Sequence, residues 1–433
     1  MPEIVEKIAD LLPEVAPVAD LINSAAGEMS HEVLPAPSSN PTEEPVDSPR
    51  KSTSDGFAAV PAKPAVYACF SPQGVPIVAA TTANLRKALQ NRIADEAESK
   101  KNRLNYAEFV EIIRYRCVGS AFAASWWYYR TVRSLFPTRY AAMLAWKAAW
   151  FITMNPRVDF PQFQISAELC DAPALCVGPL LSRRAARELM GSMEDLFDLC
   201  RYYDILRQAP HGTPCAYKEL GKCSAACDGT ISLTEYQSQA TAAGHFLADS
   251  LEARSRWFEQ QEAKIRQAAS RMDFRLAALC KRKLDLADKL NQGKLTQVHN
   301  MDEWKYLIFQ RGKTKHWVAA FVAGPGWILA FPEVQESAVN EHLYTWMQVC
   351  NLGVAEHLVK ETFPIEEVAA LVTYHKYRPA DAGLYIPMGQ TMSIEVIYQA
   401  MRIWLNYEDQ DEMPELNSAT RPARVRRGEK PAS

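Results

Sequence analysis

Four of the ten cysteines in this 433-residue sequence lie close together and constrain how the surrounding chain can fold. Cys200, Cys215, Cys223 and Cys227 are separated by fourteen, seven and three residues. Four thiolates suffice to hold a zinc ion or an iron–sulfur cluster. Cys223 and Cys227 are spaced so that both sulfurs can reach one metal. Because there is no paired C-x-x-C array, the spacing alone leaves four ordinary buried cysteines as the alternative.

The residues around these cysteines favour a ligand loop. Pro214 and Gly221 supply bends next to Cys215 and Cys223. We expect Lys218 and Lys222 to offset part of the negative charge that a set of thiolates would carry.

The composition is that of a globular protein, with 48% hydrophobic and 23% charged residues. The length allows about two to four domains. The formal net charge of −3 excludes a molecule that is basic throughout. A nucleic-acid-binding surface would therefore have to be a local patch.

The sequence predicts a cytoplasmic protein without a membrane segment. The most apolar region, 121–154, is interrupted by basic residues that are costly in hydrocarbon, namely Arg130, Arg133, Arg139 and Lys147. Glu3, Glu6 and Asp10 argue against a secretory signal. In a reducing compartment the cysteines are expected to be thiols or metal ligands rather than disulfides.

We divide the first part of the chain into two segments. Residues 1–62 are expected to form a short helix and a disordered linker rich in Pro, Ser, Glu and Thr. Residues 63–155 should form a small α/β domain. It should open with a β-hairpin, 65–70 and 75–80, joined by the turn Ser71–Gly74. Helices are expected over 84–93 and 104–113, and in 120–154, where buried helix best explains Trp126, Trp127, Trp146 and Trp150.

The remaining segments complete an α+β fold class. Residues 156–231 form a cysteine-rich region that includes a helix over 182–199. Residues 232–292 should form a helical hairpin that begins at the capping box Ser232–Glu235 and turns near Arg271–Asp273. Residues 300–410 predict an α+β domain, with strands at 304–310, 317–322 and 327–331 and helices at 335–350, 353–361 and 393–406. Residues 411–433 form a basic tail that we expect to be disordered.

The cysteine segment resembles a specific stretch of UvrC, the nuclease subunit of bacterial nucleotide excision repair. Pro214–Ser232 reads PCAYKELGKCSAACDGTIS and resembles the family's PCLYYQIGRCSAPCVGxIS. Gly178-Pro179, the helix that follows it, and Phe197–Cys200 also fit, so the resemblance covers roughly residues 64–290. It implies that Cys200, Cys215, Cys223 and Cys227 hold a [4Fe-4S] cluster, with zinc as the alternative. The remaining cysteines are expected to be core residues.

Residues 63–155 resemble the GIY-YIG nuclease domain of that family, but with a degenerate site. Pro64–Tyr67, Asn84–Leu89 and Pro137–Tyr140 match its motifs. Hydrolysis by this fold needs a carboxylate to hold a metal and a cation to stabilise the phosphoryl charge. At the catalytic positions only Tyr67 is retained, and the others are replaced by Val78, Thr81, Ala88 and Tyr128.

No acidic residue lies between Glu111 and Asp159, where the metal-binding glutamate should be. Arg86 or Lys87 could replace the missing cation, but neither can hold a metal. We therefore expect an inactive pseudo-nuclease with no catalytic Mg²⁺ and no catalytic residues.

Residues 274–284 resemble the UVR motif, the hairpin through which UvrC contacts UvrB. Phe274, Ala277 and Ala278 match, but Lys281 is followed by Arg282 where the family has an acidic residue. Such a charge reversal can exclude one partner and favour another. A hairpin that packs on its own chain and a basic nucleic-acid-binding surface are the alternatives.

Residues 300–406 resemble neither the RNase H-like nuclease nor the helix–hairpin–helix repeats of the family, and we assign them no role. The expected function is a UvrC-like DNA-repair-associated protein that binds DNA or a repair partner. An active structure-specific endonuclease with a relocated site and a scaffold unrelated to DNA are the alternatives.

Overall fold

The computed structural model describes residues 2–21, 57–93, 106–169, 175–248, 251–351, 359, 361–378, 383–388 and 393–406. The expected tail and residues 27–56 of the expected linker 27–62 lie outside these residues. The end of that linker prediction was wrong, because Phe57 and Val60 are buried in the core of the first unit. The chain divides into two compact units, the first comprising 1–145 and 310–317 and the second 146–309 and 318–433. Both helices and strands are abundant, so the predicted α+β class is confirmed.

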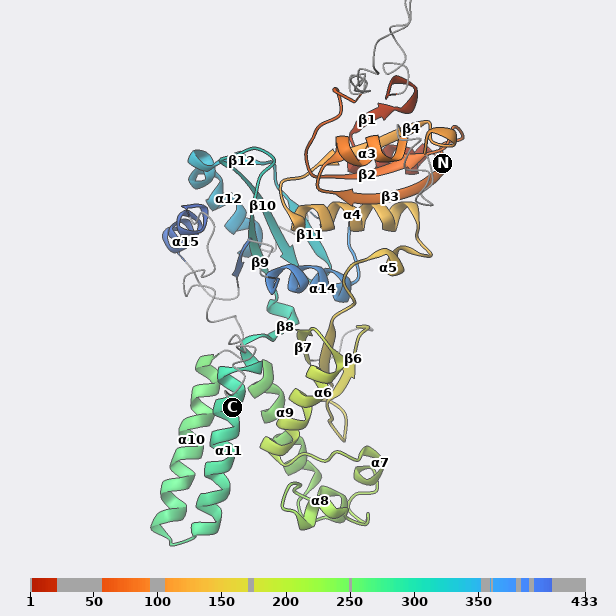
Figure 1. The fold of residues 1–433 in the computed structure, drawn as a ribbon. Helices are drawn as coiled ribbons and strands as arrows, with labels where there is room; N and C mark the ends of the chain where they lie inside the picture. The colour runs from red at the N-terminus through yellow and green to blue at the C-terminus, as the bar shows by residue number, and fades with distance from the viewer. Residues whose placement is uncertain are drawn as a thin grey trace, which may run out of the picture. The chain divides into compact units, whose positions relative to one another are not determined.

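The first unit is built on an antiparallel sheet with the strand order β1-β4-β2-β3 (Figure 1). Strands β2 (Ala65–Phe70) and β3 (Pro76–Thr82) form the predicted hairpin. Gly74 takes a φ of 73° in its turn, a conformation that glycine adopts without steric cost. The outer strands are β4 (Ile112–Cys117) and β1 (Glu14–Pro17).

Alternating residues of this sheet face two helices. Tyr67 and Cys69 of β2 join a buried cluster with Leu85 and Leu89 of α3 (Leu85–Ile93). The opposite face packs on α4 (Ala121–Leu135), which begins at the cap of Ser120. The Arg116 guanidinium of that face lies 4.0 Å from the Trp127 ring centroid. The unit also contains α1 (Pro2–Leu11), η2 (Tyr106–Glu108) and α5 (Tyr140–Met143).

One helix prediction in this region was wrong, and a second is confirmed only in part. Of the segment 104–113, the described residues 106–113 form the turn η2 before β4 starts at Ile112. The reason lies in the alternation after it, where Ile113, Tyr115 and Cys117 are buried and both neighbouring strands supply backbone partners. The helix expected in 120–154 stops at Leu135, just before Pro137, and Trp150 starts a strand.

The second unit begins with a sheet of order β6-β5-β7-β8. Its strands are β5 (Trp150–Met154), β6 (Gln164–Ser166), β7 (Leu175–Leu180) and β8 (His299–Asn300). Helices α6 (Arg183–Phe197) and α9 (Leu233–Ala248) share one buried core with this sheet. The predicted capping box is confirmed, since Ser232 Oγ accepts from Glu235 N and the Glu235 carboxylate accepts from Ser232 N.

The predicted helical hairpin consists of α10 (Leu251–Ser270) and α11 (Phe274–Gln292), which lie side by side in Figure 1. The connecting turn, 271–273, is where the sequence placed it. Helix α9 is not part of the hairpin, because its apolar face packs on α6 and β7. The short η4 (Lys294–Thr296) follows α11.

The α+β region after residue 300 contains the three predicted strands. After the short η5 (Met301–Glu303) come β9 (Tyr306–Arg311), β10 (Trp317–Gly324) and β11 (Trp327–Ala330), which pair in sequence order. Strand β13 (Leu384–Pro387) pairs with β9, and the short β12 (Val334–Gln335), followed by η6 (Glu336–Ala338), pairs with β10.

The helices of this region are α12 (Val339–Asn351), α14 (Ile365–Lys376) and α15 (Ile394–Asn406). Of the helix expected at 353–361, all but residues 359 and 361 lie outside the described part of the chain. Within the described residues, no helix has the length and apolar character needed to cross a bilayer.

Candidate functional site

The four candidate ligand cysteines lie in one loop region between α6 and α9. Cys200 follows the end of α6, and Cys215 is the N-cap of the short α8 (Ala216–Glu219). Cys223 and Cys227 flank Ala225, whose φ of 56° turns the backbone into the short η3 (Ala226–Asp228). Helix α7 (Tyr203–Leu206) lies between the first two cysteines. Cys227 is buried and the other three are partly exposed.

The loop is held together by close backbone contacts. Gly212 N donates to Cys227 O at 2.8 Å, and a Cβ on Gly212 would lie only 3.0 Å from that oxygen. Ser224 N donates to Asp198 O at 3.1 Å, which fixes the residue beside Cys223. The loop thus gathers cysteines from three short segments.

The thiols interact with one another. The Cys200 side chain is hydrogen-bonded to Cys223, which also accepts from Ala225 N at 3.3 Å. These bonds stabilise the thiolate and lower the pKa of Cys223 to about 6, while they raise the pKa of Cys200. Burial, and then the charges of Cys223, Asp228 and Cys215, raise the pKa of Cys227.

The four cysteines suit a metal by the chemistry of their thiols, but not by the positions of their side chains in this structure. Four thiols are the donor set that zinc and [4Fe-4S] clusters use. However, among the described residues no three Cys, His, Asp or Glu side chains lie close enough to hold a metal ion. Cys200, Cys215, Cys223 and Cys227 would be the residues that hold a metal or cluster in this loop.

The nearby cations are placed differently from our expectation. Lys218 is paired with Asp228, and Lys222 Nζ lies 3.6 Å from Asp195 Oδ1. Arg201 also pairs with Asp195, at 2.7 Å, and with Glu194, at 3.4 Å. Each lysine therefore has a carboxylate as its direct partner.

In the first unit, the retained Tyr67 is enclosed in the core. It is only 5% exposed, opposite Ala80 of β3 and Tyr115 of β4. Burial raises the pKa of Tyr67 to about 12. A phenol that is neither reachable nor easily ionised is poorly suited to position or activate a water molecule.

The degenerate positions do not converge on one pocket. Val78 lies opposite Cys69, on the same face as Tyr67, while Thr81 pairs with Val66 on the other face. Ala88 is on α3. The Tyr128 hydroxyl, on α4, donates to Met143 O at 3.5 Å. Of the alternative cations, Arg86 donates to the carbonyls of Val60 and Ala58, and Lys87 is exposed.

One carboxylate of this sheet comes from the N-terminal segment 1–62, which we expected to lie outside the domain. Glu14 of β1 lies opposite Tyr115, so the row across the sheet reads Glu14, Tyr115, Tyr67 and Ala80. Its carboxylate accepts a hydrogen bond from the Tyr115 hydroxyl, and burial together with this charge raises the pKa of Tyr115 to about 12. The short run Glu14–Pro17 gave no clear strand signal, and the pairing with β4 is long-range.

The hairpin carries the proposed partner residues at and beyond its turn. Met272 and Phe274 are 78% and 70% exposed, and Lys281 and Arg282 are exposed as well. Ala278 is exposed and Ala277 partly so. In contrast, Lys283 is half-buried and bonded to Asp198. The turn therefore presents two large apolar side chains beside basic ones.

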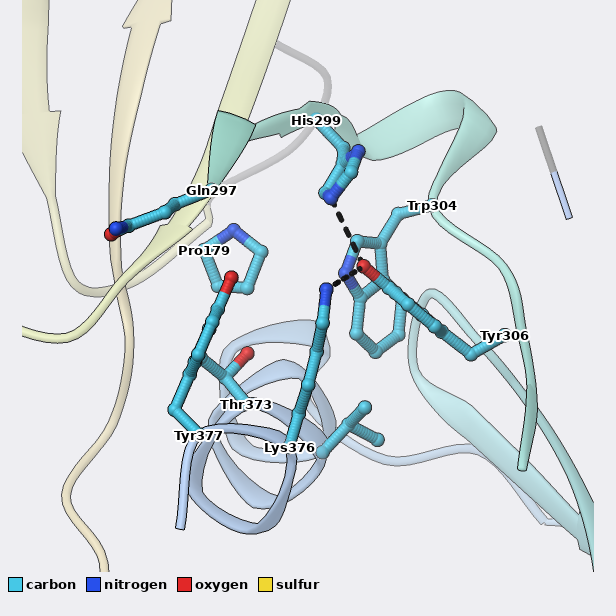
Figure 2. A pocket seen from close by; sticks show the side chains of 9 residues that line it. Pro179, Gln297, His299, Trp304, Tyr306, Thr373, Lys376 and Tyr377 are labelled. Atoms are coloured by element: carbon cyan, nitrogen blue, oxygen red, sulfur yellow. Dashed lines mark hydrogen bonds between the residues drawn. The ribbon is translucent and has the colours of Figure 1, made fainter. Parts of the chain in front are cut away.

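A chain of buried polar side chains, which no local sequence pattern indicates, lies elsewhere in the second unit. Figure 2 shows Lys376 and His299 converging on the Tyr306 hydroxyl, at 2.9 Å and 3.0 Å. Burial lowers the pKa of Lys376 to about 8. Burial and then the charge of Lys376 lower the pKa of His299 to about 3. A neutral His299 accepts from Tyr306, which accepts from Lys376.

This polar chain is not a ligand cavity. The space among the lining residues does not admit a water molecule. The Tyr377 hydroxyl, which points toward Pro179 in Figure 2, is buried without a hydrogen-bond partner among the described residues. We assign this cluster a structural role where α14 meets β7 and β8.

Comparison with known proteins places the cysteine loop in a family segment. Residues 149–246 match the model of the UvrC/Cho excinuclease middle domain, a range that contains all four cysteines. The UvrABC system protein C of Geobacter sp. (strain M21) is 25% identical over 187 residues, 43% of this chain and 29% of that protein. That of Citrifermentans bemidjiense is 25% identical over 218 residues, 50% of this chain and 34% of that protein.

The same protein of Syntrophotalea carbinolica is 32% identical over 128 residues, 29% of this chain and 20% of that protein. The alignments thus span about a third or less of the length of these curated relatives. No solved structure matches the chain. Residues 149–246 are therefore similar to the UvrC/Cho excinuclease middle domain, and the aligned parts of the chain are similar to UvrABC system protein C.

Proposed function

We propose that this chain is a nucleotide-excision-repair-associated binding protein in which a [4Fe-4S] cluster organises the middle domain and the nuclease-like sheet is inactive. The observation that carries the proposal is the four-cysteine loop, which lies entirely within the segment that matches the UvrC/Cho middle domain. Contact between Cys200 and Cys223 supports a shared site.

The first unit would keep the GIY-YIG-like sheet as a binding platform without hydrolysis. The buried Tyr67 and the absence of a carboxylate on α4 support this proposal. The hairpin would contact DNA, a UvrB-like protein or another repair partner through Phe274, Ala277, Ala278, Lys281 and Arg282. The exposed Phe274 and Met272 support a protein contact, because isolated large apolar side chains at a turn gain most from burial.

DNA binding is tested by measuring affinity for duplex and bubble DNA at several salt concentrations. A surface that neutralises phosphates releases counterions, so the affinity should fall steeply as salt rises, with a log–log slope of about −0.9 for each phosphate contacted. Binding that is undetectable even at low salt would favour the scaffold alternative, in which the old fold serves partners unrelated to DNA.

Glu14 favours the second candidate, an active structure-specific endonuclease with a relocated site. Its carboxylate lies in the same cross-sheet row as Tyr115 and Tyr67. The test is cleavage of bubble, flap and nicked DNA with added Mg²⁺ or Mn²⁺, comparing the wild type with Glu14→Gln. Our proposal expects no cleavage by either protein. Cation-dependent cleavage that Glu14→Gln abolishes would establish the second candidate instead.

A further inference from the structure

Asp198 occupies a junction between three parts of the second unit. It is the C-cap of α6 and takes a left-handed conformation with a φ of 52°. Its own N–H and that of Leu199 both donate to Glu194 O, which closes the last turn of the helix. Cys200 follows two residues later, so the direction of the chain into the cysteine loop is set here.

The carbonyl of Asp198 holds the far side of the cysteine loop. It accepts from Ser224 N at 3.1 Å and from Ser224 Oγ at 3.3 Å. Ser224 is adjacent to Cys223, whose side chain is hydrogen-bonded to Cys200. One peptide group thereby sets the separation between the segments that carry two of the four cysteines.

The carboxylate of Asp198 holds the hairpin. Its Oδ2 lies 2.5 Å from Lys283 Nζ of α11, and the two side chains are only 29% and 18% exposed. A pair this sheltered is less screened by solvent than a fully exposed one. Lys283 is nine residues from Phe274, about 13 Å along a rigid helix at 1.5 Å per residue. A displacement of the turn would therefore be transmitted along α11 to Asp198.

We propose that Asp198 is a positioning residue that couples the cysteine loop to the hairpin, so that the order of one depends on the order of the other. The functional meaning of this coupling rests on the proposed functions of the loop as a cluster site and of the hairpin as a partner-binding element. Occupation of the cysteine site would then set the orientation of α11, and binding at the hairpin turn would alter the cysteine loop. Such a coupling must be reciprocal.

The test is amide hydrogen exchange, read by mass spectrometry on the full chain, for the wild type, Lys283→Met and Asp198→Asn. Asparagine tolerates the left-handed conformation, so Asp198→Asn removes the charge while keeping the turn. We expect Lys283→Met to speed exchange at Ser224 and Ala225 about fivefold, which corresponds to about 1 kcal/mol. Asp198→Asn should speed exchange by a similar factor in α11 around residue 283.

Two further variants make the result specific. Lys289→Met removes an exposed lysine from the same helix and should leave the cysteine loop unchanged. Lys283→Arg keeps the cation and should restore most of the protection. Changes confined to the mutated element in both Lys283→Met and Asp198→Asn, or no change in either, would overturn the coupling.

Iron and sulfide are measured in the same samples. A wild type that binds neither would count against the cluster, while the exchange data would still decide whether Asp198 couples the two elements. The cluster and the coupling through Asp198 can therefore be disproved independently of each other.

Discussion

At the scale of single residues, the clearest departure from ordinary chemistry is the buried amine of Lys376. Its ammonium donates to the Tyr306 hydroxyl, and no carboxylate lines the surrounding site. Burial without an opposite charge favours the neutral amine. The cost of a charged Lys376 should therefore appear as a pH-dependent term in the stability of the second unit.

The folded-state pKa of Lys376, about 8, lies below the ordinary lysine value of 10.5. Between these values the unfolded chain binds more protons, so stability should rise with pH from 8 to 10.5. At about 1.4 kcal/mol per pKa unit, this gain is on the order of 3 kcal/mol. Urea unfolding of the wild type and Lys376→Met from pH 7 to pH 10 measures it. If the free energy of unfolding depended on pH in the same way in both proteins, the lowered pKa of Lys376 would be contradicted.

The sequence predicted some of these residues and not others, for a physical reason. The sequence indicated the four candidate ligand cysteines, because residues that bind one metal occur at recognisable spacings. They are Cys200, Cys215, Cys223 and Cys227. Lys376, Asp198 and Glu14 have partners 70, 85 and 101 residues away in the sequence, namely Tyr306, Lys283 and Tyr115. The local sequence around these residues does not indicate partners that far away in the chain.

At the scale of elements, the turn of the hairpin exposes a large apolar side chain at the start of α11. Phe274 is 70% exposed and follows the N-cap Asp273, whose side chain accepts from Leu276 N. The helix start is therefore stabilised by the cap and does not depend on the phenyl ring. This separation allows partner binding to be weakened without unfolding α11.

We expect Phe274→Ala to weaken binding of a purified UvrB-type protein at least tenfold, because a buried aromatic anchor at an interface contributes about 1–2 kcal/mol or more. The unfolding midpoint should stay close to that of the wild type. Fluorescence anisotropy and thermal unfolding measure the two effects, with Lys289→Met as the control. Unchanged affinity in Phe274→Ala would remove this residue from the contact surface.

Elements with a strong local signal were predicted well. The β2–β3 hairpin, the α10–α11 hairpin and strands β9 to β11 appear where apolar runs and turn residues indicated. The strand β4 was mistaken for a helix, because Ile112 and Ile113 continue an apolar spacing that also fits a helical face. Its partners β1 and β2 decide between the two, and that pairing is a tertiary effect.

At the scale of the whole molecule, the two units contain different elements of the proposed function. The first holds the sheet that we propose to be an inactive nuclease-like platform, with Tyr67 enclosed in its core. The second holds the cysteine loop, the hairpin and the α+β region, to which we assign no activity. The match to the UvrC/Cho middle domain falls within the second unit, which makes the cysteine loop the most direct point at which to test the account.

The most direct measurement is the iron, sulfide and zinc content of anaerobically purified wild type, Cys223→Ser and Cys176→Ala, where Cys176 is a buried cysteine of β7 outside the loop. If the four cysteines hold a [4Fe-4S] cluster, we expect about four iron and four sulfide per chain in the wild type and in Cys176→Ala. Cys223→Ser should lose both. Stoichiometric zinc without sulfide, or iron and sulfide retained in Cys223→Ser, would contradict this expectation.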